Sequence, residues 1–298
     1  MKIAIASCGN LPDWEVDDQA LYDALARSGV AFDIVPWDQY GVDWGHYDAC
    51  LIRTTWDYME RRAEFVEWAQ RVASMTMLLN DAGVVAWNTD KTYLRLLESR
   101  GTPIADTVWL RAGTSVDVGE ILREKAWERG FLKPVVGASA RETLRFGIDE
   151  LEDAQVLLSR LLPNESFMLQ PYFEDVETEG EISAIYFDGQ LSHAVQKIPV
   201  AGDYRVQDDY GASDFPVQLS DTLESLAEGA LEHGRQALGM EAPFLYARVD
   251  FIPVGDGRHV VNELELVEPS LFLRHSANAA GLLVEALLRR LKYPERKS

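Results

Sequence analysis

The strongest constraint on the fold is a pair of short segments near the C-terminus that alternate polar and apolar residues. Residues 245–253 and 259–267 alternate with a period of two, as strands with one buried face do. Between them lies Gly255-Asp256-Gly257-Arg258, a sequence typical of a tight turn. The two segments therefore predict an antiparallel hairpin, and a turn centred near Asp256–Gly257 would set which side chains face one another.

One face of this hairpin carries most of its charge. In the expected register Asp250 lies opposite Glu263 and Arg248 lies opposite Glu265, with paired Cβ atoms roughly 5 Å apart. Three carboxylates and one arginine then share a small patch, which is costly unless a cation neutralises it. Carboxylate oxygens suit Mg²⁺, particularly where substrate phosphates complete its coordination shell. The alternative is a solvated strand face that is acidic because the whole chain is acidic.

The charge of the chain also limits its partners. Among 298 residues, 49 Asp and Glu outnumber 28 Lys and Arg, so the formal net charge is −21. Such a surface repels phosphate backbones, which argues against nucleic acid as a partner. No apolar run approaches the roughly 20 residues of a membrane helix, and the N-terminus lacks the pattern of a secretory signal. Two cysteines, Cys8 and Cys50, are too few for a disulfide framework. A cytoplasmic location is therefore expected.

The first 87 residues alternate short apolar strands with helices, which predicts a small parallel α/β sheet. The expected strands are 2–7, 32–36 and 48–53, and the expected helices are 17–28 and 63–75. The glycine motifs that bind dinucleotides or form a P-loop are both absent from the sequence. A nicotinamide enzyme and a P-loop NTPase are therefore unsupported.

The chain changes character at about residue 88. A loop of small residues, 137–143, follows an expected strand at 131–134, and most of the later segments are strands, with a turn at Asp188-Gly189. An amphipathic helix is expected at 277–291. It could supply a homodimer interface, although such a helix more often packs on its own core.

The pattern Arg-x-Asp followed by Asn-Glu-x-Glu, at residues 248–250 and 262–265, resembles the Mg²⁺-binding hairpin of the ATP-grasp superfamily. That superfamily includes bacterial glutathione synthetases and D-alanine–D-alanine ligases. The resemblance covers about residues 88–275, and the preceding segment fits the small Rossmann-like domain that usually precedes this fold. It implies an α/β plus α+β architecture with three parts: an N-terminal α/β domain over 1–87, a central lid subdomain over 88–169 and a C-terminal nucleotide- and metal-binding subdomain over 170–298.

The resemblance also implies a nucleotide site. It makes Asp250, Glu263 and Glu265 ligands of two Mg²⁺ ions that bridge the phosphates of ATP, with Mn²⁺ able to replace them. Many relatives have Asn at the place of Glu265, and a carboxylate there is expected to bind metal equally well. The other implied nucleotide-binding positions are Lys91, Lys133, Gly137, Ser139, Gln170, Tyr172, Phe173 and Glu181.

These positions have separate implied roles. Lys91 and Lys133 resemble the phosphate-binding lysines, and residues 137–143 resemble the flexible lid over the β- and γ-phosphates, with fewer glycines than many relatives have. Residues 170–173 resemble the hinge whose backbone binds the adenine edge, and Glu181 fits the carboxylate that holds the ribose hydroxyls. Taken singly, each has an ordinary explanation, such as a solvated lysine or the end of a strand. The resemblance accounts for their order and spacing in one chain.

The implied activity is ATP-dependent ligation. An ATP-grasp ligase phosphorylates a carboxylate, and an amine then displaces phosphate to give an amide, with release of ADP and phosphate. Lys197, Arg205 and Arg248 fit the cations that stabilise the transferring phosphoryl group. Lys197 and Arg205 could instead offset an acidic surface. Two other classes stay open: a non-catalytic ATP- or ADP-binding regulator, and an α/β binding protein that takes no nucleotide.

The substrate is expected to be a small amino-acid-like molecule. Within the superfamily, the chain looks most similar to the group that includes the D-cycloserine-forming ligase, which closes O-ureido-serine into a ring. The similarity rests on residues 53–58, 202–207 and 262–270. Ring closure and the joining of two molecules both stay open.

Residues 53–58 follow an expected strand of the parallel sheet, where ligands bind in such folds. Arg53 could pair with a substrate carboxylate and Asp57 with an ammonium, beside Trp56. The alternative is a buried aromatic cap with one structural ion pair. Ser270 and Arg274, just past the acidic hairpin, could also face the substrate.

Overall fold

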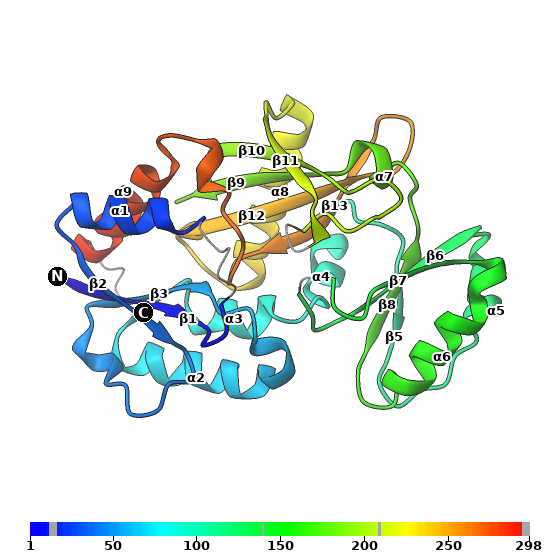
Figure 1. The fold of residues 1–298 in the computed structure, drawn as a ribbon, viewed down its shortest axis with the longest axis horizontal. Coiled ribbons are helices and arrows are strands. Elements are labelled where there is room, and N and C mark those ends of the chain that lie inside the picture. The colour runs from blue at the N-terminus through cyan, green and yellow to red at the C-terminus, as the bar shows by residue number, and fades with distance from the viewer. Residues whose placement is uncertain (12–16, 139, 208–209, 294–298) are drawn as a thin grey trace.

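The computed structural model describes residues 1–11, 17–138, 140–207 and 210–293, and the strands of these residues form three sheets (Figure 1). The N-terminal sheet has four parallel strands, the central sheet has four antiparallel strands and the C-terminal sheet has five antiparallel strands. In Figure 1 the N-terminal and C-terminal sheets lie close together, whereas the central sheet stands to one side of both.

The N-terminal sheet is parallel because helices return the chain between its strands. Its strands, in the order β2-β1-β3-β4, are β1 (Lys2–Ser7), β2 (Ala31–Pro36), β3 (Ala49–Thr54) and β4 (Met77–Leu79). Its helices are α1 (Gln19–Arg27), α2 (Arg62–Met75) and α3 (Ala82–Asn88), with short 3₁₀ helices η1 (Trp44–His46) and η2 (Tyr58–Arg61). The strands β1 and β3 are almost wholly buried, as expected for apolar strands that are covered on both faces. The predicted alternation of strands and helices over the first 87 residues is confirmed.

The central sheet has the order β5-β8-β6-β7 and a small core of its own. Its elements are β5 (Val108–Leu110), α5 (Val118–Lys125), β6 (Arg129–Pro134), β7 (Leu144–Gly147), η3 (Ile148–Glu150), α6 (Leu151–Leu161) and β8 (Phe167–Pro171), and α4 (Tyr93–Ser99) precedes them. Helices α5 and α6 pack on one face of the sheet through Leu122 and Leu158, against Leu132 and Phe146 of the strands. The small loop of residues 137–143 joins β6 to β7.

The C-terminal sheet contains the acidic hairpin. Its strands, in the order β11-β10-β9-β12-β13, are β9 (Glu181–Phe187), β10 (Gln190–Ile198), β11 (Ser213–Val217), β12 (Tyr246–Pro253) and β13 (His259–Glu265). The remaining helices are α7 (Val176–Glu179), α8 (Asp221–Ala237), η5 (Leu273–His275) and α9 (Ala279–Lys292). Asp188 and Gly189 both have positive φ, as the predicted two-residue hairpin turn between β9 and β10 requires.

Helix α9 packs on its own chain. Its apolar residues Leu283, Val284 and Leu287 are fully buried in a core that also contains Ile5 of β1 and Ile185 of β9. The helix therefore does not offer this face to a second copy of the chain, as a dimer interface at 277–291 would have required. No helix in the described part of the chain is long and apolar enough to cross a membrane.

A buried asparagine joins the N-terminal sheet to the C-terminal sheet. The amide of Asn80, which follows β4, donates to the backbone oxygens of Tyr246 at 3.0 Å and Leu266 at 2.8 Å. Its Oδ1 accepts from the backbone N–H of Leu245 at 2.8 Å. The side chain is 4% exposed, so water cannot replace these bonds.

Replacing Asn80 with leucine should therefore destabilise the protein. The change keeps the approximate volume but leaves a buried N–H and two buried carbonyls without partners, at about 1–3 kcal/mol for each group that stays unsatisfied. We expect the thermal unfolding midpoint of Asn80→Leu to fall by several degrees, at about 2–4 °C per kcal/mol for a chain of this size. The exposed Asn164 supplies the control, since Asn164→Leu should leave the midpoint within about one degree. Equal midpoints for both variants would contradict the role of Asn80.

Candidate active site

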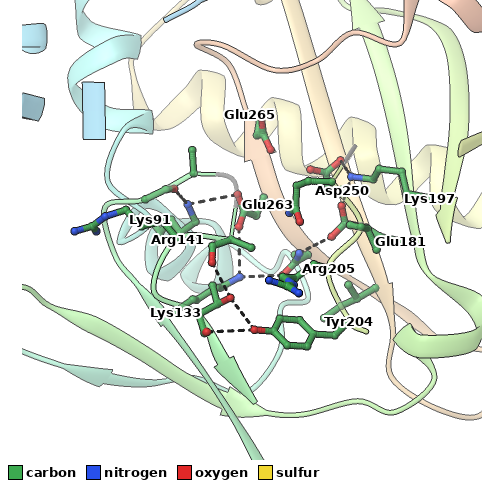
Figure 2. A pocket seen from close by; sticks show the side chains of 18 of the residues that line it. Lys91, Lys133, Arg141, Glu181, Lys197, Tyr204, Arg205, Asp250, Glu263 and Glu265 are labelled. Atoms are coloured by element: carbon green, nitrogen blue, oxygen red, sulfur yellow. Dashed lines mark hydrogen bonds and ion pairs between the residues drawn. The ribbon is translucent and has the colours of Figure 1, made fainter. Parts of the chain in front are cut away.

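A pocket lies between the C-terminal sheet and the central sheet (Figure 2). The hairpin β12–β13 forms one wall, and β6, β8 and the loop after β6 form the opposite wall. The loop after β3 closes one end through Trp56 and Tyr58. Most of the residues that the sequence singled out line this pocket, although they come from widely separated segments.

The acidic hairpin has the predicted register. Asp250 pairs with Glu263 and Arg248 pairs with Glu265, and the register then shifts by one residue. This bulge leaves Asn262 without an opposite residue and turns its side chain into the pocket. Asn262 donates to Glu181 Oε2 at 2.7 Å and accepts from Lys133 Nζ at 3.0 Å. It thereby connects the two walls, a role that residue type alone does not reveal.

Asp250 is the most deeply buried carboxylate of the hairpin, at 2% exposure. Arg248 binds it through two nitrogens, Nε at 2.9 Å from Oδ1 and Nη2 at 2.9 Å from Oδ2, and Ser183 donates to it from β9. Burial raises the pKa of Asp250, but Arg248 and then Lys197 more than offset this and hold the pKa below its usual range. Asp250 is therefore ionised, in contact with positive charge.

Glu263 lies between two lysines of the opposite wall. Its carboxylate is 3.5 Å from Lys91 Nζ and 3.6 Å from Lys133 Nζ (Figure 2). Burial opposes ionisation, yet Lys91 and Lys133 lower the pKa of Glu263. Lys91 Nζ also donates to the backbone oxygen of Gly137 at 2.6 Å, so this lysine connects the hairpin to the loop after β6.

Unlike Glu263, Glu265 has a single ion-pair partner among the described residues and shares it with another carboxylate. It forms an ion pair with Arg248, which Asp250 already occupies. Burial, followed by the neighbouring charges of Asp250 and Glu263, raises the pKa of Glu265 to about 8. The three carboxylates predicted to share this face do so, and within the described part of the chain Glu265 has only a shared arginine to neutralise it.

Glu181 and Lys197 form a buried ion pair beside Asp250. The side chains are 8% and 6% exposed, and burial lowers the pKa of Lys197 less than Asp250 and Glu181 raise it. The close approach of β9 and β10 here depends on Gly180, which has φ +70°, because a Cβ at this position would lie 1.9 Å from the backbone oxygen of Lys197. The glycine therefore places this pair on the pocket wall.

The segment from Gln170 to Phe173 lines the far end of the pocket. The side chain of Gln170 donates to Thr107 Oγ1 at 2.9 Å, and its strand pairs with β6 through Phe131. The Tyr172 ring packs near Phe131 and under the guanidinium of Arg129, at 4.9 Å from the ring centroid. Gly137 lines the pocket, whereas Ser139 lies outside the described residues.

Two loops meet over this end. Thr143, at the end of the loop after β6, is 3.0 Å from the hydroxyl of Tyr204, and Arg145 donates to the backbone oxygen of Gly202 at 2.9 Å. Arg205 lines the pocket from the same loop as Tyr204, with its guanidinium on Asp203 at 2.6 Å and over the Tyr210 ring. Its charge is therefore shared with a carboxylate that the sequence did not single out.

The expected substrate residues divide into two groups. Trp56 and Ser270 line the pocket, but Arg53 and Asp57 do not. Arg53 is 1% exposed and binds Asp18 at 2.8 Å and the backbone oxygen of Pro269 at 3.0 Å, because its side chain points into the sheet–sheet junction. Asp57 accepts from the Trp37 indole at 2.7 Å. The alternative of an aromatic cap with a structural ion pair describes residues 53–58 better.

Arg274 pairs with Asp17 and Asp214 and is absent from the pocket lining. The pocket instead contains Glu268, three residues beyond Glu265, which the sequence analysis passed over. A glutamate in an acidic chain carries no signal by itself, and only the fold brings it beside Tyr58 and Lys91.

Comparison with known proteins identifies the family. The model of the N-terminal domain of D-cycloserine synthetase DcsG matches residues 3–80. The cycloserine biosynthesis protein DcsG of Streptomyces lavendulae is 33% identical over 289 residues, which are 93% of this chain and 95% of that protein. The chain belongs to the ATP-grasp ligases, in the family of D-cycloserine synthetase.

Solved structures agree with this assignment. The crystal structure of D-cycloserine synthetase DcsG superimposes on this ATP-grasp ligase with a TM-score of 0.90 and 29% identity, over 98% of this chain and 100% of that one. D-alanine–D-alanine ligase from Bacillus anthracis shares the fold, with a TM-score of 0.69 and 17% identity over 99% and 100% of the two chains. The family forms carbon–nitrogen bonds and releases ADP, so the predicted fold and enzyme class are confirmed.

The buried pair of Glu181 and Lys197 allows a direct test of the electrostatics of the pocket. Lys197→Met leaves Glu181 buried without its cation, and we expect a loss of about 3–5 kcal/mol in the free energy of unfolding. The double variant Glu181→Gln/Lys197→Met should recover much of this loss, since no unpaired charge remains in the pair. Thermal unfolding of these two variants and of the wild-type chain measures both effects.

The exposed pair Lys125–Asp106, at 2.8 Å, is the matched control. Lys125→Met should cost no more than about 1 kcal/mol, because solvent screens such a pair. A double variant as unstable as Lys197→Met would show that the loss comes from packing and not from charge.

Proposed function

We propose that this ATP-grasp ligase activates a small amino-acid-like carboxylate as an acyl phosphate and then joins the activated carbon to an amine nitrogen. The arrangement of charge in the pocket carries the proposal: the acidic face of β12–β13 lies opposite Lys91 and Lys133 and next to Arg248. This arrangement suits a phosphorylated substrate, and the family supplies the type of reaction.

The chemistry follows from the weakness of a carboxylate as an electrophile. Transfer of the γ-phosphoryl group of ATP to a carboxylate oxygen gives an acyl phosphate and ADP. The nitrogen lone pair then attacks the acyl carbon, the carbon–oxygen bond to phosphate breaks, and the nitrogen loses a proton. Both steps need positioning and neutralisation of charge more than a covalent contribution from the protein. The cations Lys91, Lys133 and Arg248 would provide that neutralisation.

Asp250, Glu263 and Glu265 would hold two Mg²⁺ ions. Their oxygens suit a hard cation, and the three carboxylates lie on one face of the hairpin with Arg248, Lys91 and Lys133 as their cations. Among the described residues, no set of three such side chains is already gathered around one point, because each carboxylate is turned to a lysine or arginine. Bound Mg²⁺ would neutralise phosphate oxygens and orient the transferring group.

The adenine end would lie against the backbone of residues 170–173 and the ring of Tyr172. Glu181, held by Asn262 and Lys197, would accept hydrogen bonds from the ribose hydroxyls. Lys197 and Arg205 would contribute positive charge, although each already neutralises a carboxylate of the protein.

Ring closure is the second candidate within this class. The identity of 33% to a cycloserine biosynthesis protein and the TM-score of 0.90 to D-cycloserine synthetase favour a reaction in which one molecule supplies both the acid and the nitrogen. A substrate of the O-ureido-serine type would be the corresponding acid.

The first test is Mg²⁺-dependent release of ADP from ATP, with pools of D- and L-amino acids, hydroxyamino acids and O-ureido-serine. We expect one pool to raise the rate well above that with ATP alone. Asp250→Asn and Glu263→Gln should each lower the stimulated rate by about 10²–10³-fold, because charge that stabilises the transition state is lost. Glu285→Gln, on the exposed face of α9, is the control and should retain the rate. Full activity of both hairpin variants would contradict the assigned site.

The mass of the product separates the two candidates. Ring closure gives a product from one acid molecule, whereas intermolecular ligation gives a product that contains the masses of two substrates less water. Stimulation that needs two different compounds together would exclude ring closure.

A further inference from the structure

One carboxylate of the pocket lacks a cation. Asp250, Glu263, Glu265 and Glu181 each form an ion pair with a lysine or arginine of the chain. Glu268 lines the same pocket, and no lysine, arginine or histidine of the described residues lies within ion-pair distance of it. Lys91 and Arg248, whose charges act on Glu268, form their ion pairs with the carboxylates of the hairpin.

The backbone that carries Glu268 is held in place by side chains from β3, from the loop after it and from β12, namely Arg53, Trp56 and Tyr246. The Trp56 indole donates to the backbone oxygen of Glu268 at 3.0 Å, and Arg53 donates to that of Pro269 at 3.0 Å. The hydroxyl of Tyr246 donates to that of Val267 at 2.8 Å. The backbone oxygens of three successive residues, 267–269, thus each accept a side-chain hydrogen bond. The Glu268 side chain therefore has a defined position in the pocket wall.

The surroundings of Glu268 are apolar on one side. The Tyr58 ring beside it is 4% exposed and stacks on Phe65 with centroids 4.8 Å apart. Burial raises the pKa of Glu268 to about 7, against the Tyr58 hydroxyl and the charge of Lys91, which lower it. A positive group placed here would keep this carboxylate ionised.

A second acceptor in the pocket is also unsatisfied. Gln207 lines the pocket, and its Oε1 is buried and has no hydrogen-bond partner among the described residues. A buried acceptor without a donor is costly, and native structures leave few of them. The pocket therefore contains a carboxylate without a cation and an amide oxygen without a donor among the described residues, and a ligand with charged N–H donors would satisfy both.

We propose that Glu268 is the residue that binds the ammonium group of the amino-acid substrate, with Trp56 and Tyr58 as the wall around it. The proposal deepens the proposed function and rests on it. It replaces Asp57, which the Trp37 indole occupies outside the pocket, as the partner of the substrate ammonium. It also gives the N-terminal domain a role in choosing the substrate.

The test compares Glu268→Gln with the wild-type chain in the ADP-release reaction. A hydrogen bond to a charged group is worth about 1.5–3 kcal/mol, so the KM for the stimulating amino acid should rise by about 10–150-fold. The KM for ATP and the Mg²⁺ concentration at half-maximal rate should change by less than about threefold, which a general loss of structure would not allow. Tyr58→Phe, which removes only a hydroxyl, should have a smaller effect on the same KM.

Analogues in which the α-amino group is replaced by hydroxyl give an independent readout. The wild-type chain should discriminate against the hydroxy acid by a factor similar to the rise in KM, and Glu268→Gln should lose this discrimination. Glu285→Gln, on the exposed face of α9, should keep the discrimination of the wild type.

Three results would overturn the proposal. One is an unchanged amino-acid KM in Glu268→Gln, and another is a rise in the Mg²⁺ requirement instead, which would make Glu268 a metal ligand. The third is stimulation of the wild-type chain only by acids without an ammonium group, or by none of the acids tested. In this last case the proposed function fails too, and ADP binding by the unstimulated chain shows whether the nucleotide site remains. An unchanged KM in a working ligase concerns Glu268 alone.

Discussion

The structure depends on neutralising carboxylates that have been taken out of water. An isolated buried carboxylate is strongly unfavourable, and even a buried ion pair stabilises little once desolvation is included. The pocket nevertheless brings Asp250, Glu263, Glu265 and Glu181 together, each paired with a lysine or arginine of the chain. Arg248 pairs with both Asp250 and Glu265. Lys91 and Lys133 both pair with Glu263. Stability alone does not explain such an arrangement, because apolar residues of similar volume would serve it equally well.

A site for highly charged substrates does explain it. The cations and carboxylates of such a site already lie in one pocket, so binding of phosphate and of a metal ion would require only local changes of side-chain partners. Lys91 and Lys133 contact Glu263 in the structure, and they would exchange part of this contact for phosphate oxygens. Each carboxylate of the hairpin therefore has a cation in the absence of substrate, although Arg248 is shared by two of them.

The sequence predicted those parts of the fold that repeat with a simple period. The parallel N-terminal strands and the register of β12 and β13 follow from the spacing of apolar residues, and both agree with the structure. The period of a strand does not say what contacts a side chain at its end, so Arg53 near the end of β3 could be assigned to a substrate although it binds Asp18. Asn262 reaches the pocket through a bulge, and a bulge is set by strand pairing and not by residue type. Glu268 was missed because its environment comes from residues about two hundred positions earlier.

The chain segment that follows β13 links the acidic face of the hairpin to Glu268. Asn80, Tyr246 and Arg53 fix the chain that runs out of β13, and that chain carries Glu265 and Glu268 into the pocket. Glu263 and Glu265, which we propose as Mg²⁺ ligands, and Glu268 are therefore parts of one continuous segment, held by a single set of buried hydrogen bonds. In our proposal Glu263 and Glu265 act at the phosphates and Glu268 holds the substrate. Because one backbone segment carries all three, it would position the acyl group relative to the transferring phosphoryl group. Such positioning is the main contribution that a protein can make to phosphoryl transfer.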